Sequence, residues 1–477
     1  MAAADFLFDG FLQSLEYEPT DCQKTMFRKL AGFLSGDDSD IMVVNGYAGT
    51  GKTTAVSAAI SFLKSLKVNC VLLAPTGRAA KVLSGYAHTP AYTVHKHIYR
   101  QKSVSGSGFG EFVIGPNKDR DTVYFVDEVS LIGVDSGGQA NLFGSGNLLL
   151  DLMEYVRRGT DNKVILIGDK AQLPPVGLDV SPALSEDYIS MLGCPVWTEL
   201  VTVVRQRSGS GILDNATSLR NEIQRLENYG ADEVNLVMDV RNCSDIERIS
   251  GSELIEKLSD AYDRYGDDET VIVCRSNKRA IKYNLGIRST VQFKEEMLVK
   301  GDRLMIVRNC YQFVQDLKDV DYIANGDIAT LESISHYEDR YGLHFARARL
   351  SFPDYDEQEI TATVILDTLT SESPALTAEQ QNMLYAGVNE DYSHIRTKKK
   401  RYEAVREDKY FNALQLKYAN AITCHKSQGG QWKCVFIDNP FWQDELLPDD
   451  LKWLYTALTR STEKVYLVNF KDSYFVQ

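Results

Sequence analysis

Long apolar runs are missing from this sequence of 477 residues: no stretch of 18 or more apolar residues occurs, which excludes a membrane-spanning helix. The first residues, Met1 to Asp5, contain neither a basic segment nor an apolar core, so we expect no signal peptide. The eight cysteines form no C-x-x-C pair, and the seven histidines show no zinc-ligand spacing. We therefore expect reduced thiols in an intracellular protein without a zinc site.

Positive charge is also scarce. The chain has 52 lysine and arginine residues against 66 aspartate and glutamate residues, a net charge of −14. This balance argues against a protein that coats nucleic acid through its whole surface, although a local basic channel is compatible with it. Hydrophobic residues make up 44% and charged residues 25%, which excludes a disordered or fibrous chain. The length predicts two to four domains.

Short apolar runs alternate with helical patterns through the first 200 residues, and the alternation resumes after residue 200 and again near the C-terminus. Strands that alternate with helices imply parallel sheets covered on both faces, so we predict two α/β lobes. The runs that predict strands are Ile41–Val44, Val71–Ala74, Val123–Val126, Val164–Ile167, Thr270–Cys274, Cys434–Asp438 and Lys464–Val468.

Two segments interrupt this alternation. Residues 99–120 contain a Gly/Ser-rich stretch between β-capable flanks, which predicts an inserted hairpin or a flexible loop. Residues 300–415 contain four short β-like runs, which predict a small antiparallel barrel, followed by a polar helical stretch with a basic run at 396–401. We expect lobe one at 1–98 and 121–200, lobe two at 201–299 and 416–477, and the two insertions between these parts.

A phosphate-binding pattern, G-x-x-x-x-G-K-T, occupies residues 46–53 between a predicted strand and a predicted helix. Glycines let backbone N–H groups converge on phosphate oxygens, and the start of the helix favours an anion. Lys52 would neutralise the β- and γ-phosphates, and Thr53 would place a hydroxyl on Mg²⁺. We therefore expect ATP and Mg²⁺ as cofactors. The expected nucleotide-binding residues of this loop are Gly46, Ala48, Gly49, Thr50, Gly51, Lys52, Thr53 and Thr54.

An acidic pair, Asp127 and Glu128, follows the apolar run that ends at Val126. After a phosphate-binding loop, such a pair predicts that Asp127 holds Mg²⁺ with Thr53, and that Glu128 orients and deprotonates the attacking water. A later loop with tandem prolines carries Gln172, a polar group suited to sensing the γ-phosphate.

Further motifs follow in order: Pro19–Gln23, Ala74–Ala80, Thr93–His95, Val204–Gln206, His425–Gly429 and Thr459–Arg460. Together they strongly resemble superfamily 1 helicases of the 5′-to-3′ branch, the group with RecD-like, phage Dda-like and Pif-type DNA helicases. The resemblance implies two RecA-like lobes. It also implies that Gln23 reads the adenine, that Arg205 and Arg460 reach the phosphates from lobe two, and that Gln428 and Gly429 link the DNA contact to the ATP cleft.

The same resemblance implies contacts to single-stranded DNA, and a hairpin pin at 99–120 whose aromatic wedge is Phe109 or Phe112. A structural role for individual loop residues, a merely flexible loop at 99–120, and a solvated helix face at 396–401 stay open as alternatives. The expected DNA-contacting residues are Pro75, Thr76, Arg78, His95, Phe109, Thr423, His425 and Lys426.

The sequence thus predicts an ATP- and Mg²⁺-dependent DNA helicase that acts as a monomer on single-stranded DNA and at junctions with duplex. Its 5′-to-3′ polarity is implied by the resemblance alone. An RNA or RNA/DNA-hybrid helicase, and a P-loop ATPase switch not coupled to nucleic acid, remain alternatives. The cellular pathway, whether replication, recombination or repair, stays open. Because the chain is acidic, we expect positive potential only in the cleft lined by Arg78, His95 and Lys426.

Overall fold

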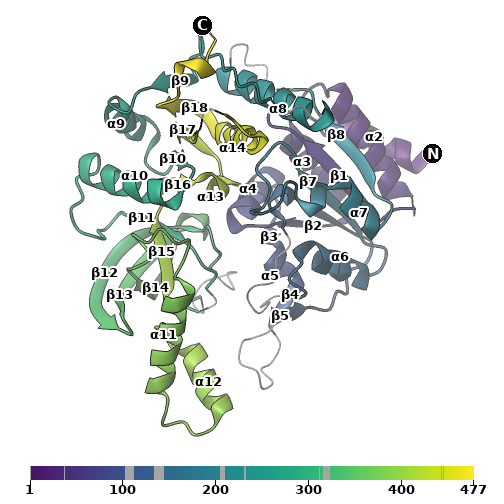
Figure 1. Ribbon diagram of the computed structural model, residues 1–477. Coiled ribbons are helices and arrows are strands. Elements are labelled where there is room, and N and C mark those ends of the chain that lie inside the picture. The colour runs from purple at the N-terminus through teal and green to yellow at the C-terminus, as the bar shows by residue number, and fades with distance from the viewer. Residues whose placement is uncertain are drawn as a thin grey trace.

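A computed structural model describes residues 2–36, 38–101, 112–133, 144–204, 210–229, 233–310, 312–314, 323–355, 357–441, 443 and 445–476. The expected fold class is confirmed: two parallel sheets stand beside each other, and a closed barrel is attached to the second (Figure 1). Among the described helices, none combines the length and the apolarity that crossing a bilayer requires.

The first sheet has six parallel strands in the order β3-β2-β6-β7-β1-β8. Its central strands are continuous apolar runs, as expected for strands covered on both faces, and two hydrophobic clusters pack against them. The strands are β1 (Ile41–Gly46), β2 (Asn69–Ala74), β3 (Ala91–Thr93), β6 (Thr122–Val126), β7 (Lys163–Gly168) and β8 (Val196–Leu200).

Five helices of this lobe, α2, α4, α5, α6 and α7, begin at residues whose side chains cap them. Thr20 and Gln23 form a reciprocal capping box at the start of α2, and Asn147 accepts a hydrogen bond from Leu150 N at the start of α6. The helices of this lobe are α1 (Ala2–Gln13), α2 (Asp21–Ser35), α3 (Lys52–Ser65), α4 (Gly77–Ala87), α5 (Val94–Ile98), α6 (Leu148–Arg158) and α7 (Glu186–Leu192).

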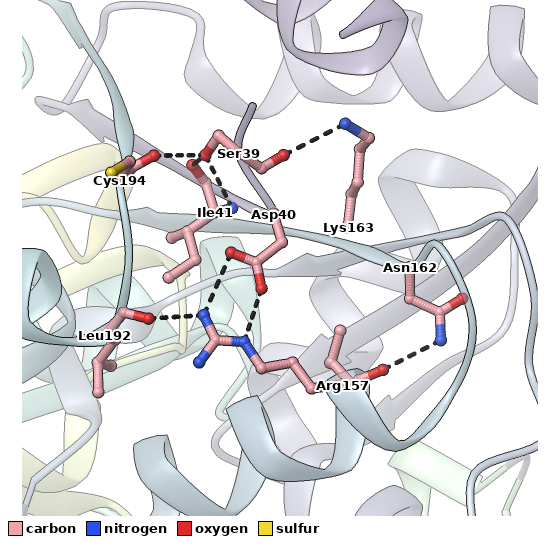
Figure 2. Close-up of polar contacts among 9 residues, drawn as sticks. Ser39, Asp40, Ile41, Arg157, Asn162, Lys163, Leu192 and Cys194 are labelled. Carbon is pink, nitrogen blue, oxygen red and sulfur yellow. Dashed lines mark hydrogen bonds and ion pairs between the residues drawn. The ribbon is translucent and has the colours of Figure 1, made fainter. Parts of the chain in front are cut away.

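Polar contacts fasten the amino-terminal ends of the strands (Figure 2). Arg157 forms an ion pair with Asp40 at 2.6 Å and donates to Leu192 O, and Lys163 donates to Ser39 O. Lys163 also donates to the carbonyls of Phe33 and Gly36. These bonds tie β1 and β7 to α2, α6 and the end of α7. Structural contacts occupy the amino-terminal ends of these strands. A ligand is therefore expected at their carboxyl-terminal ends, where open parallel α/β sheets bind ligands.

A two-stranded antiparallel ladder, β4 (Tyr99–Gln101) with β5 (Phe112–Ile114), stands where the inserted hairpin was expected. Phe112 pairs with Gln101 in this ladder, whereas Phe109 lies outside the described residues.

The second sheet has five parallel strands in the order β16-β10-β17-β18-β9. One of its hydrophobic clusters also contains Tyr47, Ala171 and Leu173 from lobe one, so the two lobes share part of their core. The elements of this lobe are α8 (Gly211–Tyr229), β9 (Ile246–Ile249), α9 (Leu254–Tyr265), β10 (Thr270–Cys274), α10 (Asn277–Thr290), β16 (Ala421–Thr423), α13 (Cys424–Ser427), β17 (Trp432–Asp438), α14 (Pro448–Leu458) and β18 (Ser461–Val468).

The expected barrel is closed by five strands, but its strands are not all antiparallel as predicted: β14 and β15 pair in parallel. Between these two strands the chain forms the α11–α12 hairpin, which projects from the barrel (Figure 1), and β15 begins beside the last residues of β14, with Leu414 opposite Val364. The elements are β11 (Arg303–Ile306), β12 (Ile328–Arg340), β13 (Leu343–Phe352), β14 (Gln358–Ile365), α11 (Ala378–Asp391), α12 (Lys398–Glu407) and β15 (Leu414–Tyr418).

Candidate ATP site and nucleic-acid interface

The phosphate-binding loop leaves β1 at Gly46 and enters α3 at Lys52. Gly49 and Gly51 have φ values of 76° and 70°, the left-handed region that favours glycine. A Cβ at Gly51 would stand 2.7 Å from Gln23 Nε2, so this position is closed to side chains as well. Thr53 and Thr54 lie in the first turn of α3, where backbone N–H groups have no intrahelical acceptor and the helix dipole attracts anions.

Gln23 lies directly beside this loop and is 1% exposed. Its Nε2 donates to Thr50 O at 3.2 Å, and its Oε1 accepts from Thr20 N at 3.0 Å. Both ends of the amide are thus bonded within the protein. Because the amide nitrogen carries a second N–H and the oxygen a second lone pair, Gln23 keeps capacity for a contact with the base.

The acidic pair stands at the end of β6, in the strand next to β2 and β7. Asp127 Oδ1 accepts from Glu128 N at 2.9 Å. Burial raises the pKa of Asp127 to about 6; the charge of Lys52 opposes this shift and the charge of Glu128 adds to it. The three charged groups therefore interact with one another, as a site for phosphate and Mg²⁺ needs.

Glu128 has two unusual features. Its φ is 53°, which is rare for a residue with a long side chain, and its Oε2 is buried with no hydrogen-bond partner among the described residues. Gln172 Oε1 likewise has no partner in the described part of the chain, and Gln172 is 5% exposed. Two unsatisfied acceptors beyond the ends of neighbouring strands are consistent with side chains that hydrogen-bond a bound water or ligand.

Asp169 is a further acidic residue at the same edge, directly after β7, and it was not among the expected site residues. Burial raises the pKa of Asp169, and Lys52 is the main charge that lowers it. Asp169 Oδ1 accepts from Ala171 N at 2.9 Å. Its place after a parallel strand adjacent to β6 was the available signal in the sequence.

Lobe two reaches the phosphate-binding loop through Tyr455 of α14, another residue that the sequence did not identify. Its hydroxyl accepts a hydrogen bond from Ala48 N at 2.8 Å and donates to Asp169 Oδ2 at 2.8 Å. Tyr455 is 1% exposed. A single hydroxyl from lobe two thus joins the phosphate-binding loop to the loop that carries Gln172.

Two more bonds from lobe two hold the same loop. Leu173 N donates to Thr456 Oγ1 at 2.8 Å, and Gln428 Nε2 donates to Leu173 O at 2.7 Å. Gly429 has a φ of 74°, and a Cβ there would stand 3.0 Å from Ala79 Cβ, so lobe two packs closely against α4.

Of the two arginines expected to reach the phosphates from lobe two, the structure describes only Arg460. Arg205 lies outside the described residues. Arg460 is 4% exposed, and its guanidinium donates to Thr456 O, Gly430 O and Thr459 Oγ1 at 3.1–3.3 Å. These bonds use three of the five guanidinium N–H groups, so the others can donate to phosphate oxygens if Arg460 acts as an arginine finger.

The expected DNA contacts in lobe one lie between β2 and β4. Pro75 stands in the connection before α4, and Thr76 caps α4 by accepting from Ala79 N at 3.2 Å. The Arg78 guanidinium stacks 3.9 Å from the centre of the Trp432 ring and so bridges the lobes. The His95 ring lies 5.6 Å from the Tyr99 ring.

In lobe two, Thr423 ends β16, and His425 and Lys426 belong to the short helix α13. Burial and the nearby charge of Arg275 lower the pKa of His425. Lys426 Nζ donates to Asn325 Oδ1 at 2.5 Å. Among the described residues, no group of three or more His, Cys, Asp or Glu side chains forms a metal site.

Comparison with known proteins matches two parts of the chain to known families. Residues 20–234 match the AAA domain, and residues 418–468 match the UvrD-like helicase C-terminal domain. The uncharacterized protein MJ1519 of Methanocaldococcus jannaschii is 22% identical over 468 residues, covering 89% of this chain and 36% of its own. The ATP-dependent RecD2 DNA helicase of Deinococcus radiodurans is 33% identical over 139 residues, covering 28% of this chain and 16% of its own.

The matched part of this chain spans about a third of the length of the Methanocaldococcus protein and about a sixth of the length of the Deinococcus helicase. Among solved structures, a Pif1 helicase from Bacteroides in complex with ADP-AlF3 and ssDNA is 15% identical, with 97% of this chain and 95% of that chain covered and a TM-score of 0.46. The two family matches and the RecD2 match confirm the resemblance of this chain to the superfamily 1 helicases of the RecD type.

Proposed function

We propose that this protein is an ATP- and Mg²⁺-dependent DNA helicase that moves 5′ to 3′ on single-stranded DNA and unwinds duplex at junctions. The observation that carries the proposal is the arrangement around Asp169: hydrolytic groups come from lobe one, and Tyr455, Thr456 and Gln428 reach the same loops from lobe two. Such an arrangement lets the state of the nucleotide change how the lobes are held together.

Each residue has a role in this proposal. Lys52 and the N–H groups of the loop bind the phosphates, and Thr53 and Asp127 would hold Mg²⁺, which supplies charge neutralisation at the transferring phosphoryl group. Glu128 takes the proton of the attacking water through its unsatisfied carboxylate oxygen. Arg460, and Arg205 by resemblance, stabilise the transition-state charge from lobe two.

The strand would run across both lobes, over Pro75, Thr76, Arg78 and His95 on one side and Thr423, His425 and Lys426 on the other. We further propose that the domains divide at residues 98, 120, 200 and 299, and at residue 418, where the barrel strand β15 ends, in place of the expected boundary at 415. In this view the lobes step along the strand as a monomer, and the β4–β5 ladder stands at the duplex junction.

The experiment that tests the proposal is unwinding of matched duplexes with a 5′ or a 3′ tail, made as DNA and as RNA. We expect ATP-dependent unwinding of the 5′-tailed DNA duplex. Preference for a 3′ tail would refute the polarity, and preference for RNA tails would favour the RNA helicase. ATP hydrolysis that ignores every tail would favour a P-loop ATPase not coupled to nucleic acid.

A further inference from the structure

Helix α8 of lobe two contacts the phosphate-binding loop of lobe one at Tyr47, the residue that follows Gly46. Tyr47 is 5% exposed. The guanidinium carbon of Arg220 lies 5.0 Å from the centre of the Tyr47 ring, and Gln224 Nε2 donates to the Tyr47 hydroxyl at 2.8 Å. Arg220 and Gln224 are four positions apart on α8, so both stand on the helix face that meets the loop. This contact is separate from that of Tyr455, which belongs to α14.

The Tyr47 hydroxyl is also bonded within lobe one. It donates to Glu199 Oε1 of β8 at 2.8 Å, and the same oxygen accepts from Asn45 Nδ2 at 2.8 Å. Asn45 Oδ1 accepts in turn from Lys170 N at 3.0 Å. Burial and the bond to Glu199 raise the pKa of Tyr47, so the hydroxyl keeps its proton in neutral solution and remains a donor. One hydroxyl thus joins α8 of lobe two to two strands of lobe one.

The main chain of Tyr47 connects this contact to the rest of the loop. Thr50 N and Thr50 Oγ1 both donate to Tyr47 O, at 3.3 Å and 2.7 Å. Thr50 O accepts from Gln23 Nε2, and Thr50 is fully buried, so water does not compete for these bonds. The position of Tyr47 therefore affects the shape of the phosphate-binding loop and the place of Gln23, the residue expected to read the adenine.

Arg220 is the charged member of this contact. It is 9% exposed, and its guanidinium donates to Val201 O of lobe one at 3.0 Å and to Asn221 Oδ1 at 3.3 Å. Among the described residues, Arg220 forms no ion pair with a carboxylate, and its Nε has no hydrogen-bond partner. A buried cation without a counter-charge is unfavourable, and the face of the Tyr47 ring compensates for this only in part. ATP would bring negative charge to the same loop and attract this cation.

We propose that Arg220 and Gln224 are positioning residues for ATP binding: from lobe two they hold Tyr47, and through it the phosphate-binding loop, in the shape that accepts the nucleotide. The inference rests on the proposed function and deepens it, because it makes the affinity for ATP depend on where lobe two stands. A rearrangement of lobe two that moves α8 weakens ATP binding, and bound ATP favours by the same factor the arrangement in which α8 contacts Tyr47.

The test measures the affinity for a non-hydrolysable ATP analogue with Mg²⁺, in the absence of DNA, and compares Arg220→Gln with Arg225→Gln. Arg225 is a matched control because it lies on the same helix and forms an ion pair with Glu222 of α8 at 2.8 Å. Arg220→Gln should weaken binding about tenfold, the effect of losing one charged hydrogen-bonding group, and should raise KM for ATP more than it lowers kcat. Arg225→Gln should change neither quantity. Arg220→Lys keeps the charge without the planar group, so it should restore part of the affinity.

A second pair of variants tests the route through Tyr47. Tyr47→Phe and Gln224→Leu nearly preserve side-chain size, and each deletes the bond between the hydroxyl and the amide. If Gln224 acts on the nucleotide through this bond, each single variant should weaken binding of the analogue. The double variant should then bind it as Tyr47→Phe alone does, because the bond can be lost only once.

Each contrary outcome is distinct. If Arg220→Gln lowers thermal stability but binds the analogue as the native protein does, Arg220 only holds the lobes together and the proposal is wrong. Fully additive effects of Tyr47→Phe and Gln224→Leu would also overturn it. ATP hydrolysis by the native protein that is indifferent to DNA would refute the helicase proposal alone, because the positioning role is judged by affinities measured without DNA.

Discussion

Removal of the Tyr455 hydroxyl tests whether the bonds between the lobes carry the coupling. Tyr455→Phe keeps the ring in its buried place and deletes two hydrogen bonds, from Ala48 N and to Asp169 Oδ2, both 2.8 Å long. A buried polar group that loses its partner costs about 1–3 kcal/mol. Because about 1.4 kcal/mol corresponds to tenfold in rate, we expect kcat to fall about 10- to 100-fold if these bonds form in the hydrolysing state.

The assay is steady-state ATP hydrolysis with and without single-stranded DNA, together with thermal unfolding. A positioning role predicts that kcat falls more than KM for ATP changes, and that the stimulation by DNA is lost. The matched control is Tyr474→Phe, since the Tyr474 hydroxyl is buried without a hydrogen-bond partner and its removal deletes no bond. If Tyr455→Phe hydrolyses ATP as fast as the native protein and keeps its DNA stimulation, the role of Tyr455 in coupling is refuted.

Two further predictions concern the acidic pair. Glu128→Gln should bind ATP with native affinity and hydrolyse it about 10²–10⁴-fold more slowly, because the amide cannot accept the proton of the attacking water. Nucleotide binding and single-turnover hydrolysis measure the two effects. Hydrolysis at the native rate would show that another residue is the general base. The affinity for Mg²⁺ should be constant above pH 6 and fall about tenfold per pH unit below pH 6. The reason is that Asp127, with a pKa of about 6, becomes protonated below that pH and a protonated carboxyl binds Mg²⁺ poorly. A metal titration in which the affinity stays constant down to pH 5 would contradict this prediction.

Local patterns in the sequence predicted most of the fold. The loop between Gly46 and Lys52, the acidic pair after Val126 and the parallel strands could be found because each depends on residues close together in the chain. The parallel pairing of β14 with β15 was missed, since strand direction in the barrel depends on how the α11–α12 hairpin returns the chain.

The missed site residues depend on contacts distant in sequence. Tyr455 bonds Ala48 across 407 positions, and no local pattern separates it from an ordinary core tyrosine of an apolar helix face. The role of Tyr455 depends on residues that are close in space, whereas the motif residues can be recognised from their spacing in the sequence.

The most direct test of the central claim is the rate of ATP hydrolysis by the native protein as single-stranded DNA is added. If ATP hydrolysis and DNA binding are coupled through the bonds between the lobes, the rate of hydrolysis should rise with DNA concentration until it saturates. Half of the maximal rate should be reached at the DNA concentration at which half of the protein is bound in a binding titration. A rate that stays constant while DNA is shown to bind would contradict the account.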